Sequence, residues 1–387
     1  MRRRGSAGLI MVLLVVWAIA LGAAGPWCHA ALADSGGGGV ALSLERAVEM
    51  ALERSYALKS AAYDVDRAYE VRRFAADKVQ FTPLGPTTTQ AELAFTGLVQ
   101  ADLAWQMAKR SYEAQKDTVV MSVYQAYAAV LQAQARLRTA EAQAQAADWR
   151  YRATNAMFMV GAAGRPDVAK AEAERDAARK NVESARNALA DAYQKLNQLI
   201  GLEPDARPVL EPRVEVRPLV VENLEAAVSR ALESSPTVWL AQQKIDFSRL
   251  TLDLYDFAPS QTEPYEAKEI DVTKAEVSAA DVKEQMAKLV RTLYFAGRQA
   301  ENGYAAALDN LARTREDLRL AEIRYSVGMA TRVEVEAARA AVAQAEQSVT
   351  ESAWQHEVLR LAFEKPWAYA GASMGGGGST SSSGSGR

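Results

Sequence analysis

Two stretches of the chain place small apolar residues at the spacing of a coiled coil. The first stretch follows alternating steps of three and four, interrupted by Arg175, through Val168, Ala171, Ala178, Val182, Ala185, Leu189, Ala192, Leu196 and Leu199. The second stretch repeats the pattern at Val335, Ala338, Val342, Ala345, Val349, Ser352, His356, Leu359 and Phe363. This spacing predicts helices that pack along one face, and the many small residues let the helix axes approach closely. Aromatic residues make up only 7% of the chain, which favours thin helical walls over a thick core.

The two stretches belong to two copies of a larger unit. The opening Leu44–Val48 recurs as Leu224–Val228, and the turn Phe158–Val168 recurs as Tyr325–Val335. These landmarks repeat at offsets of 180 and 167 residues, so the second copy is 13 residues shorter. A unit of this length exceeds solenoid repeats of roughly 20 to 50 residues and indicates a tandem duplication. The predicted boundaries are 42–201 for the first copy, 202–220 for a linker and 221–367 for the second copy.

Each copy contains another long helical stretch before its turn, at 98–157 in the first copy and 272–325 in the second. Neither stretch contains an internal proline. Fifty helical residues span about 75 Å, and so long a helix persists only by packing along its length. We therefore expect antiparallel hairpins with the helices at 167–200 and 332–365. The predicted fold class is predominantly all-α, with two tandem copies of a long coiled-coil hairpin.

The two ends of the sequence indicate export and a non-globular tail. Residues 1–33 have the pattern of a signal peptide, with Arg2–Arg4, an apolar run and a small-residue cleavage site at Ala31–Ala33. An uncleaved signal anchor is the alternative, and either interpretation predicts that the body is exported. Cleavage would remove Cys28, the only cysteine, so helix packing must supply the stability. The glycine run in 34–41 predicts a linker, and the Gly- and Ser-rich segment 368–387 predicts a disordered tail.

The composition argues against several classes of function. The net charge is -3 with 24% charged residues, so no polybasic surface for nucleic acid is indicated. His356 is the only histidine after the predicted signal and falls on the seam, where the first copy has Leu189. We interpret it as a packed structural residue rather than a metal ligand. The sequence predicts no enzyme activity, no cofactor and no metal site.

The two turns are the candidate functional sites. Val160, Gly161 and Ala162 form the first turn, and Val327, Gly328 and Met329 form the second. In one interpretation, exposed apolar side chains at the end of a polar rod dock to another helical hairpin. In the other, glycine supplies the positive φ that ends a helix and valine packs locally as a cap.

The chain resembles the TolC family of outer-membrane factors over about Leu42 to Trp367. The resemblance rests on the two openings, the two turns and the ending Leu199–Gly201 of the first copy. It implies self-association as a trimer whose helices form a hollow α-barrel, in a protein located at the outer membrane. It also implies that the turns meet a periplasmic adaptor, which works with an inner-membrane pump. The resemblance therefore favours the docking interpretation of the turns.

The chain departs from the family where the family places its membrane strands. The segment 78–99 allows two short strands, at 79–82 and 92–95, and the segment 258–271 reads as a loop in which the 13 missing residues are expected. A spanning strand needs about 9 to 11 residues. We therefore expect at most one short vestigial β-hairpin, and strands this short argue against insertion into a membrane.

A charged stretch before the second turn, Asp317–Glu322, lies where the family tends to place acidic residues facing the pore. Charged residues outside a coiled-coil seam usually form a solvated face, so we assign no gate to it. The leading hypothesis is an exported helical duct or spacer component of an efflux or secretion system. The alternative is a non-conducting coiled-coil scaffold or interaction protein of the cell envelope.

Overall fold

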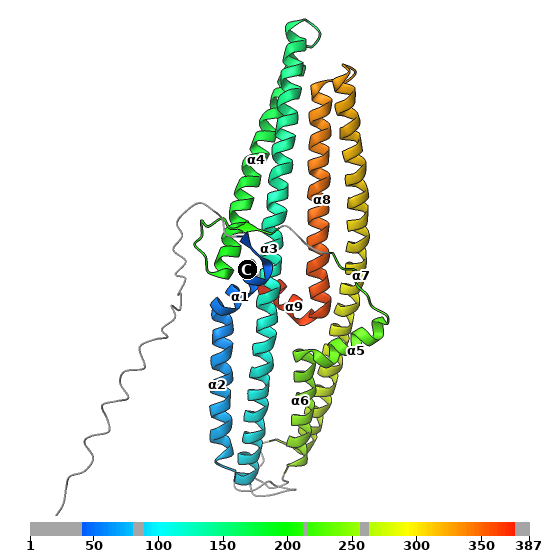
Figure 1. Cartoon of the computed structure of the whole chain (residues 1–387). Helices are drawn as coiled ribbons and strands as arrows, with labels where there is room; N and C mark the ends of the chain where they lie inside the picture. Colours follow the sequence, from blue (N-terminus) through cyan, green and yellow to red (C-terminus); the bar gives the residue numbers. More distant parts are fainter. Residues whose placement is uncertain (1–40, 80–88, 212–215, 256–262, 376–387) are drawn as a thin grey trace, which may run out of the picture. The chain divides into compact units, whose positions relative to one another are not determined.

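The computed structural model describes residues 41–79, 89–211, 216–255 and 263–375. The chain divides into two units, 1–39 and 40–387, and only the second contains described residues. The predicted signal 1–33 and nearly all of the predicted linker 34–41 thus lie outside the described residues. The helices are α1 (Leu44–Arg54), α2 (Tyr56–Ala76), α3 (Thr89–Met159), α4 (Arg165–Ile200), α5 (Leu224–Ser234), α6 (Pro236–Asp253), α7 (Tyr265–Ser326), α8 (Arg332–Glu364) and α9 (Pro366–Gly375) (Figure 1).

A single serine separates the first two helices of each half. Ser55 ends α1 and begins α2, where its hydroxyl accepts a hydrogen bond from the Leu58 N–H at 3.2 Å. Ser235 has the same place between α5 and α6, where it accepts from the Val238 N–H at 3.4 Å. Serine suits this position because its oxygen satisfies an amide that the first helical turn leaves unpaired. The same order of elements, two short helices followed by two long ones, therefore occurs in both halves.

The helices α3 and α7 each run past two shorter partners. With 71 residues, α3 spans roughly 105 Å, and it packs against α4 along one part and α2 along another. With 62 residues, α7 packs in the same way against α8 and α6. Figure 1 shows α2 and α4 beside opposite halves of α3, and α6 and α8 beside opposite halves of α7. Pairing along the whole rod supplies the contacts that an isolated long helix lacks.

The long helices begin earlier than the sequence predicted. Residues 92–95, expected as a strand, belong to α3, so that prediction is wrong. Residues 265–271, expected as a loop, are the first turns of α7, which Pro264 precedes and Glu266 in the first turn favours. Contact with α2 explains the longer α3, because Arg72 pairs with Asp102 and the Tyr69 and Trp105 rings lie 5.8 Å apart. The other expected strand, 79–82, lies almost entirely outside the described residues.

The two copies differ in the lengths of their long helices more than in the connections that precede these helices. The connection between α2 and α3 is only one residue longer than the one between α6 and α7, whereas α3 has 71 residues and α7 has 62. Most of the difference therefore lies in the long helices rather than in the loop.

The described strands form a small parallel pair rather than a hairpin, which is compatible with the prediction of at most one short hairpin. Strand β1 (Ala41–Leu42) pairs with β2 (Val209–Leu210), in the register Ala41 with Val209 and Leu42 with Leu210. The buried Tyr127 hydroxyl lies 2.9 Å from the Leu42 carbonyl and 3.1 Å from the Glu211 carbonyl. A phenol from α3 thus fixes the segment before α1 and the segment after α4 at one place.

The seam residues lie at the helix contacts. In α4, Ala171, Ala192 and Leu196 are buried and the other seam positions are half-buried, while most of the helix is exposed. In α8 two faces are buried, because this helix packs against both α7 and α3. The predominantly α-helical fold with long antiparallel hairpins is confirmed.

The main core joins the two halves through aromatic and aliphatic side chains. The Trp354 ring of α8 lies 5.5 Å from the Tyr127 ring, in a cluster with Val123 and Leu196. A second cluster places Met121 against Leu361. These contacts hold α3 of the first half against α8 of the second half.

The first residues of the predicted disordered tail are helical, and the rest of it, 376–387, lies outside the described residues. Residues 368–375 belong to α9, and Ala368 is fully buried in the second cluster. Trp367 also donates its indole N–H to Asp117 Oδ2 at 3.0 Å. No helix in the described part of the chain has both the length and the apolar character needed to cross a membrane.

Candidate docking surface at the two hairpin turns

The first turn ends α3 with a Schellman motif. The Ala162 N–H donates to the Met157 carbonyl at 2.8 Å, and the Gly161 N–H donates to the Phe158 carbonyl at 3.0 Å. Gly161 has a φ of 76°, which side-chain-bearing residues rarely adopt. These two bonds satisfy carbonyls that the helix end leaves unpaired, so the glycine has a definite local role.

The second turn repeats this geometry. The Met329 N–H donates to the Arg324 carbonyl at 2.7 Å, the Gly328 N–H donates to the Tyr325 carbonyl at 3.0 Å, and Gly328 has a φ of 76°. The next helix begins at Thr331, whose hydroxyl accepts from the Glu334 N–H while Glu334 accepts from the Thr331 N–H. This capping box fixes the start of α8 directly after the turn.

The apolar residues of the turns face solvent rather than the helices. The exposed fraction is 79% for Val160, 63% for Val327 and 78% for Met329, and Ala162 is exposed as well. The glycines therefore end the helices as one interpretation predicted, but the valines do not pack as caps. Their exposure leaves two small apolar surfaces at the turns, which we call the tip residues (Val160, Gly161, Ala162, Val327, Gly328 and Met329).

Contacts between α3 and α8 place the two turns at the same end of the described unit. Thr139 of α3 donates to the Ala343 carbonyl of α8 at 3.0 Å. Further toward the first turn, the Arg332 guanidinium lies over the Trp149 ring, 5.5 Å from its centroid. As residue numbers increase along α3, the contacted residue numbers on α8 decrease. The two helices are therefore antiparallel, and the end of α3 lies near the start of α8 (Figure 1).

Charged side chains tie the second turn to its helices. Glu336 is 2% exposed, and its carboxylate lies 2.6 Å from the Arg332 guanidinium and 3.1 Å from that of Arg339. Arg339 also pairs with Glu322 at 3.0 Å, which joins α8 to α7. In the charged stretch 317–322, Arg319 pairs with Glu316 on the surface, and this hydrogen bond lowers the pKa of Glu316.

His356 lies in the seam with no exposed surface. Its Nε2 lies 3.6 Å from Glu301 Oε1, and neither ring nitrogen has a hydrogen-bond partner among the described residues. Burial acts to raise the pKa of Glu301. The hydrogen bond from the Leu219 N–H and the nearby charge of Arg298 together lower this pKa by more, so the net shift is downward. The described residues hold no group of three or more metal-ligating side chains.

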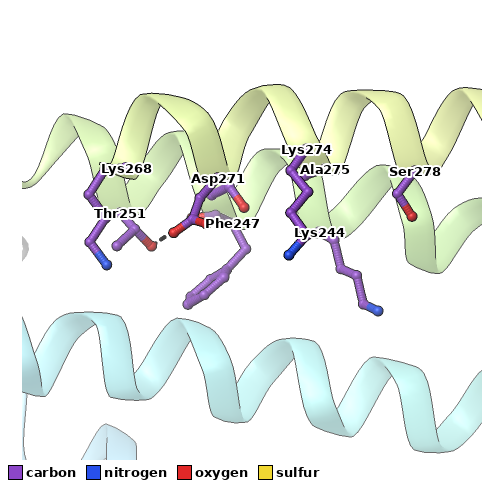
Figure 2. A pocket seen from close by; sticks show the side chains of 9 residues that line it. Lys244, Phe247, Thr251, Lys268, Asp271, Lys274, Ala275 and Ser278 are labelled. Atoms are coloured by element: carbon purple, nitrogen blue, oxygen red, sulfur yellow. Dashed lines mark hydrogen bonds between the residues drawn. The ribbon is translucent and has the colours of Figure 1, made fainter. Parts of the chain in front are cut away.

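Three clefts were not predicted from the sequence. One, of about 340 Å³, lies along α6 and α7, and Figure 2 shows Phe247 and three lysines projecting from these helices. Those lysines are Lys244, Lys268 and Lys274. Another cleft, of about 430 Å³, lies beside Trp367, and a third, of about 750 Å³, lies among α1, α2, α3 and α4. Each combines side chains from distant segments, so no local motif could have revealed it.

The sequence is similar to known efflux proteins over part of its length. Residues 97–202 match the family model described as outer membrane efflux protein. The outer membrane protein TolC of Vibrio cholerae is 24% identical over 198 residues, which cover 50% of this chain and 44% of that protein. The match thus spans less than half of the length of this relative.

Solved structures share the fold over most of the chain. The outer membrane protein VceC of Vibrio cholerae has a TM-score of 0.58 and 14% identity, with 85% of this chain and 95% of that chain covered. The CmeC outer membrane channel of Campylobacter jejuni has a TM-score of 0.62 and 14% identity, with 85% and 86% covered. The resemblance to TolC-type outer-membrane factors is confirmed.

Proposed function

We propose that this chain is an exported helical duct or spacer component of an efflux or secretion system, and that its tip residues dock to a periplasmic adaptor. The supporting observation is the pair of matching turns, which display exposed valine and methionine side chains at one end of the described unit. Apolar side chains that face solvent at the end of a polar helical hairpin suit a groove between partner helices.

The proposal includes self-association of the chain. Large apolar side chains are exposed on the outer faces of two helices, with Tyr63 at 74% and Phe74 at 64% on α2. On α7, Ile270 and Val277 are 65% and 66% exposed and lie seven residues apart, which places them on one face. Burial of such faces against further copies would remove apolar area from water. The resemblance suggests three copies.

The proposed location is the cell envelope, at the outer membrane, where the matching family model places its proteins. The partners implied by the resemblance are a periplasmic adaptor and an inner-membrane pump. The adaptor would contact the tip residues, while the pump would supply the cargo. No cargo class follows from the tip geometry.

A pair of charge substitutions tests the docking proposal. Val160→Asp combined with Val327→Asp introduces two carboxylates into the exposed apolar surface without disturbing a buried contact. We expect the variant to lose binding to purified adaptor proteins of the host and to restore the sensitivity of the host to exported compounds. Val220→Asp is the matched control, because Val220 is 84% exposed and lies in the linker away from the turns.

Light scattering on the same variants separates docking from assembly. We expect wild type, control and double variant to show the same oligomer mass. Unchanged adaptor binding by the double variant would refute docking through the tip residues. A stable monomer for the wild-type protein would refute the duct.

A non-conducting scaffold of the cell envelope is the second candidate. The helical state of residues 92–95 and 265–271 favours it, because the family resemblance places the membrane strands in these parts of the chain. Conductance of the purified oligomer in planar lipid bilayers discriminates the two candidates. A duct that opens into the bilayer gives discrete current steps, and a scaffold gives none.

A further inference from the structure

The largest of the three clefts lies where α1, α2, α3 and α4 meet. Its volume of about 750 Å³ falls within the range of small-molecule sites, roughly 300 to 1,000 Å³. All four helices of the first half contribute to its walls. It lies beside the main core, and the tip residues do not line it.

The charged side chains that line this cleft are all basic. Arg54 and Lys195 line it, and no aspartate or glutamate does. The cleft along α6 and α7 includes Asp271, and the cleft beside Trp367 includes Glu113 and Asp117. A concave wall with cations alone concentrates anions. The charge therefore distinguishes this cleft from the two smaller ones.

Arg54 is held in place without a carboxylate partner. Its side chain crosses Gly201, where an added Cβ would lie 2.9 Å from Arg54 Cδ, and its guanidinium carbon lies 5.7 Å from the centroid of the Tyr56 ring. Among the described residues no acidic group pairs with Arg54. By contrast, Arg46 on the same helix pairs with Glu49 at 2.9 Å, and Lys195 pairs with Asp191 at 2.7 Å. The guanidinium is thus available to an external anion.

The start of α2 adds amide donors to the same cleft. Tyr56 and Ala57 are the first residues of this 21-residue helix, and both line the cleft. The Ser55 hydroxyl accepts the hydrogen bond of the Leu58 N–H, so the N–H groups of Tyr56 and Ala57 have no acceptor within the helix. The positive end of the helix dipole therefore lies beside Arg54.

Apolar side chains and a fixed loop form the rest of the wall. Val119, Leu199 and Leu202 line the cleft, and Val119 and Leu202 also pack against the main core. Asn197 has no exposed surface, and its Nδ2 donates to the carbonyls of Glu203 and Ala206 at 3.0 and 2.9 Å. This amide fixes the loop after Leu202, so the apolar wall is formed before any ligand arrives.

We propose that this cleft binds an amphipathic organic anion, with a carboxylate at Arg54 and the start of α2 and an apolar chain along Val119 and Leu202. The guanidinium and the first amides of α2 supply charge-assisted hydrogen bonds to the carboxylate oxygens. The apolar wall removes the chain from water.

Isothermal titration calorimetry of the full chain with decanoate, below its micelle concentration, tests the proposal. We expect saturable binding at one site per chain, no binding of decyltrimethylammonium, and much weaker binding of acetate. Arg54→Gln is expected to weaken decanoate binding about tenfold or more, because one charge-assisted contact is lost. Arg46→Gln, which leaves the cleft unchanged, is the matched control.

Two further variants keep the test decisive. Ala57→Trp adds bulk at an exposed lining position and is expected to abolish binding with both cations intact. Lys195→Gln gives a second charge readout, with weakening of severalfold, should Arg54→Gln fail to fold by circular dichroism. Equal affinity for the decyl cation, or affinity unchanged in Ala57→Trp, would overturn the proposal.

Discussion

Leu219 and Gly297 form a contact whose energetics can be separated by a double-mutant cycle. Leu219, in the linker between the halves, is 8% exposed and lies against α7. A Cβ added to Gly297 would lie 2.3 Å from Leu219 Cδ1, which is far inside van der Waals contact. The Leu219 N–H also donates to Glu301 Oε1 at 2.5 Å. The linker is thus held to α7 by one side chain and one backbone bond.

The two single substitutions have different expected effects. Leu219→Ala removes buried methyl groups and costs about 2 to 3 kcal/mol. Gly297→Ala gains about 1 kcal/mol of helix propensity, but crowding of Leu219 costs about 1 to 3 kcal/mol. The net effect in the wild-type background is therefore a loss of about 0 to 2 kcal/mol.

The double variant removes the crowding and keeps the propensity gain. Gly297→Ala is therefore expected to stabilise the Leu219→Ala protein, with a favourable coupling of about 1 to 3 kcal/mol. Gly303→Ala is the matched control, because Gly303 lies in the same helix with nothing within 4 Å of an added Cβ. Its effect should be the same in both backgrounds.

Urea unfolding followed by far-ultraviolet circular dichroism measures these free energies, from midpoints at constant slope. Additivity of Leu219→Ala and Gly297→Ala within about 0.5 kcal/mol would refute the contact as described. Coupling of the same size at Gly303 would show that the effect does not come from Leu219.

Three other residues give independent predictions. Burial raises the pKa of Tyr127 to about 12, from an ordinary value of about 10. The neutral phenol therefore contributes stability that is fully present below a pH of about 10 and is lost as the pH rises toward about 12. The free energy of unfolding of Tyr127→Phe should not show this decrease at alkaline pH. The pKa of Glu301 is lowered, so its contribution is present above its ordinary pKa and lost as the pH falls, and Glu301→Gln should flatten the acid dependence of the urea midpoint. Thr331→Ala removes the capping box and should cost about 1 kcal/mol, seen as faster amide exchange at the start of α8 than in the wild type.

The helical seams could be predicted because their signal is local and repeated. Residues such as Ala171 and Leu196 recur at a fixed spacing over ten turns, so the pattern identifies both the helix and its buried face. The turns could also be predicted, because a glycine that follows a long periodic segment marks the end of the helix. Whether their valines pack or remain exposed is decided by the tertiary environment, which no local pattern contains.

The helix starts were mispredicted because distant contacts determine them. Residues 92–95 have apolar and aromatic character that suits a strand, yet pairing of α3 with α2 through Asp102 and Arg72 continues the helix through them. Similarly, α9 extends into a segment rich in small residues, and its Trp367 is held by Asp117 from the first half of the chain. The cleft at Arg54 and the contact at Leu219 also join separated segments.

The unbroken course of α3 has a mechanical consequence. This helix contacts α4 and α8 toward its C-terminal end, and α2 toward its N-terminal end. Between these two regions its residues pack in the main core. A continuous helix without a proline lacks the usual site for a hinge, so a partner that pushes on Val160 is expected to tilt the whole helix about the main core. The N-terminal end of α3 would then move in the direction opposite to the end that carries Val160, as in a rigid-body rotation about a fixed point.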